Sequence, residues 1–104
     1  MSAGHSAAPP VPPPPGQRPR EERVPLIRAR LQAAFDPREL EVFDDSHHHA
    51  GHAGAADGRG HYRVRIVSAA FAGMTALARH RAVYAVLDDL MQTDIHALSI
   101  DATA

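Results

Sequence analysis

Hydrophobic residues after position 24 recur at spacings of three and four, the repeat of one face of an α-helix. These residues are Leu26, Ile27, Leu31, Ala34 and Phe35. Pro25 suits the first turn of such a helix, where a missing N–H costs no hydrogen bond. Asp36-Pro37 stops the helix, because a residue before proline is driven out of the helical region. The pattern predicts a first helix that begins near Pro25 and ends at Phe35.

Two stretches with alternating polar and apolar residues follow, as expected for half-buried β-strands. In the first stretch Leu40 and Val42 alternate with glutamates, and the strand runs to about Phe43 or Asp44. In the second stretch the apolar positions are Tyr62, Val64 and Ile66, and the polar positions are His61, Arg63 and Arg65. Consecutive strands joined in this way usually pair antiparallel.

The last third of the chain predicts a second helical region and a third strand. Residues 68–73 have the composition of a turn, and Thr75 is expected to cap a helix that runs to about Met91. Its apolar stripe consists of Leu77, Val83, Tyr84, Leu87, Leu90 and Met91. Asp94 marks a break, and residues 95–100 have strand composition, with His96, Leu98 and Ile100 expected on one face.

This order predicts an α/β fold of the α+β sandwich type, with helices on one face of a three-stranded sheet. The connection between the second and third strands contains a helix and exceeds twenty residues. Such a connection suits a parallel, right-handed crossover, so the sheet is expected to be mixed. The starting ends of the two parallel strands then lie side by side. His96 is therefore expected at the same sheet edge as the long loop that precedes His61.

Residues 1–23 differ in composition from the rest and are dominated by Ala, Pro, Gly and Arg. The run from Pro9 to Pro15 favours a disordered, polyproline-like tail over a ligand for an SH3-type domain, because proline locks φ and removes donors. The folded domain is assigned to residues 24–104. The chain shows no signal peptide and no membrane span, and it has no cysteine, so we expect a cytoplasmic protein without a membrane partner.

Five histidines lie within fifteen residues, at positions His47, His48, His49, His52 and His61. Neutral imidazole is the commonest side-chain metal ligand, so this loop is either a binding site or a solvated connection that binds metal only adventitiously. The formal net charge of −1 gives no overall attraction to nucleic acid. Nucleic-acid binding would need a local basic patch, for which the candidates are Arg63, Arg65, Arg79 and Arg81.

Five blocks of the chain, taken in order, resemble the BolA-like family. They are Asp44-Asp45-Ser46-His47-His48-His49-Ala50-Gly51-His52, His61-Tyr62-Arg63-Val64, Ser68 with Phe71-Ala72-Gly73, Arg79-His80-Arg81-Ala82-Val83-Tyr84, and Ile95-His96-Ala97-Leu98-Ser99-Ile100. The resemblance runs from about Val24 to Ala102. It implies a fold related to the type II KH domain, in agreement with the order of elements read above.

The resemblance also implies a function. BolA-like proteins are partners of monothiol glutaredoxins, with which they form heterodimers that can share a [2Fe-2S] cluster in iron-sulfur trafficking or iron homeostasis. The histidine of the Ile-His-Ala-Leu block is a cluster ligand in the family, and it corresponds to His96. The second ligand comes from the loop between the first two strands. The Ser-x-x-His pattern favours His49, with His52 or His47 as alternatives.

The chemistry of a shared cluster suits this chain. Histidine can replace cysteine on one iron of a [2Fe-2S] cluster, and a glutaredoxin cysteine with a glutathione thiol would supply the thiolates that the chain lacks. The isolated chain is therefore expected to hold no cofactor. Without the resemblance, His96 would be taken for a hydrogen-bonded strand histidine in the core. His61 is expected to pack or cap, and His80 to be structural.

The alternatives come from other functional classes. The sequence shows no nucleophile–base pair of the kind that would indicate an enzyme. Some bacterial members of the family are described as transcriptional regulators of stress and morphology, which would use the KH-like face and the four arginines to bind DNA. However, Gly73-Met74-Thr75-Ala76 lacks the second glycine of the KH clamp. Divalent-metal buffering by the histidine loop and homodimer formation are further possibilities.

Overall fold

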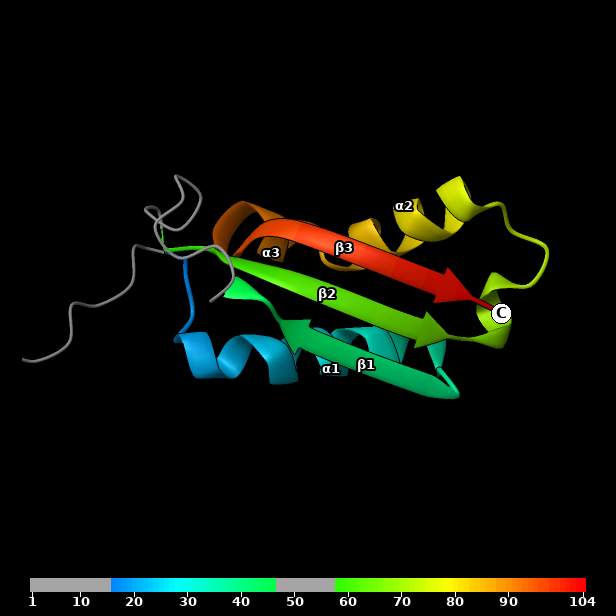
Figure 1. Ribbon diagram of the computed structural model, residues 1–104, viewed down its shortest axis with the longest axis horizontal. Helices are drawn as coiled ribbons and strands as arrows, with labels where there is room; N and C mark the ends of the chain where they lie inside the picture. The colour runs from blue at the N-terminus through cyan, green and yellow to red at the C-terminus, as the bar shows by residue number, and fades with distance from the viewer. Residues whose placement is uncertain (1–15, 47–57) are drawn as a thin grey trace, which may run out of the picture.

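The computed structural model describes residues 16–46 and 58–104, which form a three-stranded sheet with helices packed on it (Figure 1). The elements in chain order are α1 (Arg20–Phe35), β1 (Glu39–Asp44), β2 (Gly60–Val67), the 3-10 turn η3 (Ala69–Phe71), α2 (Ala76–Val86), α3 (Asp88–Thr93) and β3 (Ile95–Thr103). This order confirms the predicted α+β fold.

The sheet has the order β1-β2-β3 and is mixed, as predicted. Strands β1 and β2 pair antiparallel, and β2 and β3 pair parallel. The Gly60 N–H donates to the Asp94 carbonyl at 2.9 Å, so the starts of β2 and β3 are joined directly. The register shifts between Gly60 and His61, which places a bulge at this edge.

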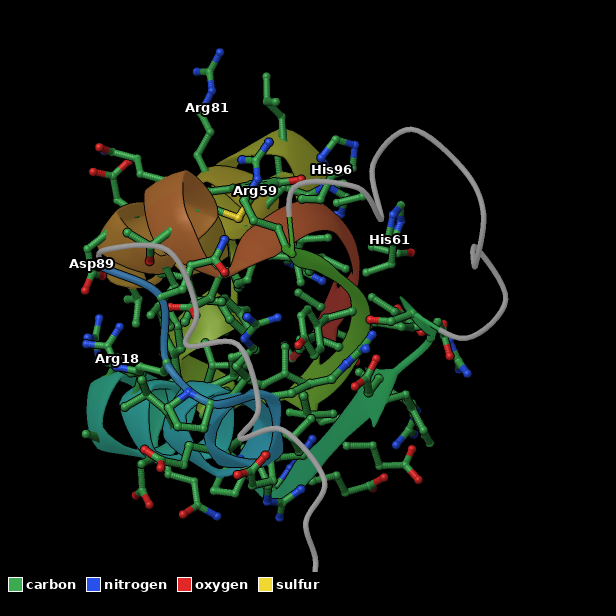
Figure 2. All side chains as sticks on the ribbon, turned by 90° about the vertical axis from the view of Figure 1, so that its left-hand side faces the viewer. Arg18, Arg59, His61, Arg81, Asp89 and His96 are labelled. Atoms are coloured by element: carbon green, nitrogen blue, oxygen red, sulfur yellow. The ribbon has the colours of Figure 1, made fainter. Side chains whose placement is uncertain are left out.

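All three helices lie on one side of the sheet, behind it in Figure 1 and to its left in Figure 2. The alternation along β2 sets the two faces, because Tyr62, Val64 and Ile66 are buried in the core whereas Arg63 is exposed on the other face. The core residues contributed by the helices, by the 3-10 turn and by the break between α2 and α3 are Ile27, Leu31, Phe71, Val83, Leu87 and Leu90.

Helix α1 begins at Arg20, five residues before Pro25, so the expected placement of Pro25 in the first turn is wrong. The earlier start has a tertiary cause, because the side chains of Arg18 and Arg23 both pair with the buried carboxylate of Asp94. Sequence periodicity cannot reveal such a contact. The expected boundary at residue 23 thus falls inside α1, and residues 1–15 of the expected tail lie outside the described residues.

The helical region expected from Thr75 to Met91 consists of two helices, because the chain breaks at Leu87. The cap is confirmed, since the Thr75 hydroxyl accepts from the Ala78 N–H at 3.1 Å. Leu77 and Tyr84 were expected in the buried stripe, but they are 58% and 38% exposed. After the break α3 contributes Leu90 to the core, whereas Val83 is the fully buried residue of α2.

The Tyr84 side chain has another role at the sheet edge. Its hydroxyl donates to the Leu98 carbonyl at 3.0 Å, and the Arg79 guanidinium donates to the Ala102 carbonyl at 3.2 Å. Both acceptors belong to β3, an edge strand whose outer backbone groups have no neighbouring strand. Among the described residues, no helix is long and apolar enough to cross a membrane.

Candidate metal centre

Two histidine side chains meet where β2 and β3 begin. The ring centroids of His61 and His96 are 5.1 Å apart, and the ring planes are inclined by 47°. His96 is exposed and His61 is half-buried. Figure 2 looks onto this end of the sheet. The structure therefore places His96 at the expected edge, and it adds His61, which the sequence assigned to packing or capping. The expected parallel pairing of the strand starts was the signal that could have identified His61.

The candidate ligands His47, His49 and His52 lie outside the described residues. The chain does enter that loop beside His61, because the Ser46 hydroxyl accepts from the His61 N–H at 3.0 Å. The Asp45 N–H also donates to the His61 carbonyl, at 2.8 Å. The loop thus starts next to the pair of histidines.

Arg59 contacts the His96 ring at Nδ1. One of its guanidinium nitrogens lies 3.2 Å from His96 Nδ1, and the other donates to the Met91 carbonyl at 3.3 Å. A guanidinium group has donors only, so Nδ1 is the acceptor and a neutral His96 carries its proton on Nε2. Arg59 therefore determines which tautomer this arrangement favours.

The described residues can supply two imidazoles to a metal centre. Two imidazoles on one tetrahedral ion, each about 2.0–2.1 Å from it, have ring centres roughly 5 Å apart. The centroid distance between His61 and His96 is of that size, which is also the distance between two ordinary packed rings. Within residues 16–46 and 58–104, no group of three His, Cys, Asp or Glu side chains could hold a metal ion. A four-ligand centre here thus needs donors from the loop or from another molecule.

A buried ionic cluster holds the start of β3. Asp94 is 1% exposed, and its carboxylate oxygens lie 3.1 Å from the Arg23 guanidinium and 3.2 Å from the Arg18 guanidinium. The backbone N–H of Arg18 and the hydroxyl of Thr93 also donate to this carboxylate, at 2.8 and 2.9 Å. Since Asp94 precedes His96 by two residues, the cluster helps to position His96. The sequence indicated only a break at Asp94.

Close packing at Gly60 fixes the neighbouring strand. A Cβ atom at this position would lie 2.6 Å from the Tyr62 hydroxyl and 2.7 Å from the Ser46 hydroxyl, so only glycine fits without movement. Burial raises the pKa of Tyr62 above its ordinary value of 10.0, and the neighbouring Arg23 partly offsets this shift. The backbone at Gly60, which directly precedes His61, is thus packed closely against the side chains of Tyr62 and Ser46.

A cavity of about 210 Å³ lies beside His61, at the end of the sheet where β2 and β3 begin. Its lining residues are Asp45, His61, Tyr62, Ala97, Leu98 and Ser99. Asp45 is ion-paired to Arg63 at 3.0 Å, so the acidic side chain of the lining is already compensated.

The four arginines of the expected basic patch lie on two elements, β2 and α2. Arg63 pairs with Asp45 and lies 4.2 Å from the centre of the Phe43 ring, and Arg65 pairs with Glu39 at 2.8 Å. The other two arginines belong to α2. The Arg79 guanidinium donates to the Met74 and Ala102 carbonyls, and Arg81 points away from the sheet in Figure 2. Arg63 lies on the open face of the sheet, whereas Arg79 and Arg81 belong to α2, which packs on the other face, so a basic patch formed by all four arginines stays a prediction.

Comparison with known proteins then gives the family. The sequence pattern described as "BolA-like protein" matches residues 31–104, which include Arg59, His61 and His96. This chain belongs to the BolA-like family. The matched range begins after Arg18 and Arg23, so both arginines that pair with Asp94 lie outside it.

Solved structures and curated sequences agree with this assignment. The BolA domain of SufE1 from Arabidopsis thaliana is 47% identical, with a TM-score of 0.71, over 78% of this chain and 90% of that domain. The Arabidopsis protein BOLA1, chloroplastic, is 45% identical over 77% of this chain, which spans 52% of that protein. The Escherichia coli DNA-binding transcriptional regulator BolA is 40% identical, over 71% of this chain and 68% of its own length. The BolA-like fold thus recurs in plant and bacterial proteins.

Proposed function

We propose that this BolA-like protein is a non-enzymatic binding protein. It pairs with a monothiol glutaredoxin and shares a [2Fe-2S] cluster with it in iron-sulfur trafficking or iron homeostasis. The observation that carries the proposal is that His96 is exposed at the start of β3, with its ring centroid 5.1 Å from that of His61. The chain itself has no cysteine. Imidazole is an accepted ligand for one iron of such a cluster.

His96 is the first ligand in this proposal. The second is a loop histidine, with His49 favoured and His52 or His47 as alternatives, or else His61, which lies next to His96. The glutaredoxin cysteine and glutathione contribute the two thiolates. The bound cluster is cargo that the two proteins hold jointly. The histidines of this chain supply only part of its four ligands.

Co-reconstitution with a monothiol glutaredoxin and glutathione tests this function. Visible circular dichroism is recorded for the wild type and for His96→Ala, with His80→Ala as a matched control because His80 is an exposed histidine on α2. We expect a cluster spectrum from the wild type and the control, and a changed or absent one from His96→Ala. Identical spectra for wild type and His96→Ala would contradict the assignment of His96 as a ligand.

DNA binding is the second candidate, because the Escherichia coli relative is named a DNA-binding transcriptional regulator. The open face of the sheet offers little positive charge for binding DNA, since Arg63 and Arg65 are already paired with carboxylates. Binding to DNA would weaken steeply with salt and would be reduced by Arg81→Ala. A gel-shift series at near-physiological salt that shows no complex would remove this candidate.

A further inference from the structure

The contact between Arg59 and His96 constrains how a metal can reach the candidate centre. One guanidinium nitrogen of Arg59 lies 3.2 Å from His96 Nδ1, and the other donates to the Met91 carbonyl at 3.3 Å. Figure 2 shows Arg59 and His96 next to each other at the start of the strands. The guanidinium group thus lies against the imidazole that the proposed function uses.

Metal binding at either ring nitrogen must break this hydrogen bond. If the metal takes Nδ1, Arg59 has to leave that atom. If the metal takes Nε2, the neutral ring must carry its proton on Nδ1, which then cannot accept from a donor-only guanidinium. The ligand nitrogen does not need to be known for this conclusion.

Charge adds a second effect, which depends on what the metal brings with it. A bare divalent cation at His96 would lie beside the positive charge of Arg59 and be repelled. A [2Fe-2S] core with a charge of 2+ becomes neutral when two thiolates ligate it, and it becomes negative on one-electron reduction. The loss of the hydrogen bond is common to both kinds of metal, so the selection comes from charge: the guanidinium repels a bare ion and does not repel a neutral or negative cluster that carries thiolates.

We propose that Arg59 is a specificity-determining residue of this centre, which disfavours bare divalent cations and reserves His96 for a thiolate-bearing cluster supplied by a partner. This inference rests on the proposed function. It goes beyond that function by naming a residue of the chain that selects the cargo.

The first test uses the isolated protein without glutaredoxin. Long-range ¹H–¹⁵N NMR correlations of the histidine rings report the tautomer of His96 directly. We compare the wild type, Arg59→Met, which removes donors and charge, and Arg81→Met, an exposed arginine of α2, as the control. The wild type and the control are expected in the Nε2–H tautomer, and Arg59→Met in a mixture. A wild-type His96 with its proton on Nδ1 would overturn the proposal.

The second test follows a Zn²⁺ titration at the His96 ring signals, so that binding by other histidines is not counted. Arg59→Met is expected to bind Zn²⁺ at His96 about tenfold more tightly than the wild type, because one neighbouring charge is removed. Arg59→Lys, which retains the charge, is expected to stay close to the wild type. Equal Zn²⁺ affinity at His96 in wild type and Arg59→Met would overturn the proposal.

Co-reconstitution separates this inference from the function on which it rests. Arg59→Met with glutaredoxin and glutathione is expected still to assemble the shared cluster, and failure to assemble it would overturn a role in selection. If the wild type itself forms no shared cluster, the proposed function fails, whatever the Zn²⁺ titration of Arg59→Met shows.

Discussion

Arg59 and His61 are two neighbours of the His96 ring with different chemistry. The Arg59 guanidinium is hydrogen-bonded to Nδ1, and the His61 ring lies 5.1 Å away across the start of the two strands. One neighbour opposes a cation and the other provides a second imidazole. The properties of this centre therefore depend on residues around His96 as much as on His96 itself.

His61→Ala is expected to alter the visible circular dichroism of the shared cluster. The ring of His61 is close enough to His96 to be a ligand or to touch one, and the spectrum is sensitive to the geometry around the iron. The measurement is the co-reconstitution described above, with His80→Ala as the control. A spectrum identical to that of the wild type would remove His61 from the candidate ligands.

At the scale of elements, two ion pairs join α1 to the segment from α3 to the start of β3, and they differ in burial. One is the buried contact of Arg23 with Asp94 before β3, and the other is the exposed contact of Arg30 with Asp89 on α3. The buried pair is shielded from solvent and the exposed pair is screened by it, so their energetic weights differ.

Asp94→Asn is expected to destabilise the fold by roughly 3–5 kcal/mol, because Arg23 would remain buried with its charge uncompensated. Chemical denaturation gives the free energy of unfolding. Asp101→Asn is the matched control, since Asp101 is exposed on β3. Equal stability of Asp94→Asn and the wild type would contradict a stabilising role for the buried cluster.

The exposed pair predicts a specific pH dependence. Two hydrogen bonds to Arg30, at 2.6 and 2.8 Å, hold the pKa of Asp89 at about 2, below its ordinary value of 3.8. Because the pKa in the folded state is lowered, the pair stabilises the protein above about pH 4, and this contribution is lost as the pH falls toward 2.

Asp89→Asn is therefore expected to lower the free energy of unfolding at pH 7 by no more than about 1 kcal/mol, since both side chains are partly exposed. The difference from the wild type should shrink between pH 4 and pH 2. Thermal unfolding over this range measures it, with Asp88→Asn as the neighbouring control. A difference that persists unchanged at pH 2 would contradict the assigned cause.

At the scale of the whole molecule, the N-terminal segment is part of the fold. Gly16 lies against Thr93, with an added Cβ only 3.1 Å from the Thr93 methyl carbon, and Arg18 binds Asp94 through both its backbone and its side chain. Residues 16–19 thus pack near the strand starts that carry the histidines. The segment contacts the two residues that directly precede β3.

Removal of residues 1–19 is expected to lower the free energy of unfolding by about 1 kcal/mol, because the hydrogen bonds from Arg18 to Asp94 are lost. Removal of residues 1–15 serves as the control, since it leaves Arg18 in place. Chemical denaturation compares the two truncated proteins. Equal stability of both would show that Arg18 adds nothing to the buried cluster.

The alternation of side chains determined β1 and β2 in the sequence, and the length of the connection to the last strand determined its parallel pairing. These features are local or follow from chain geometry, so His96 could be placed at the correct edge before the structure was known. Local pattern could not extend α1 to Arg20 or divide the second helical region at Leu87, because distant packing decides both.

The sequence by itself determined which residue types are available for chemistry: histidines in number, no cysteine, and a block that resembles the family around His96. Only the tertiary structure decided which of them meet. It brought His61 to His96, placed Arg59 on Nδ1 of that ring, and packed α2, with its two arginines, on the sheet face opposite to Arg63. The physical reason is that these contacts join residues far apart in the chain, through strand pairing and the separation of the sheet into two faces.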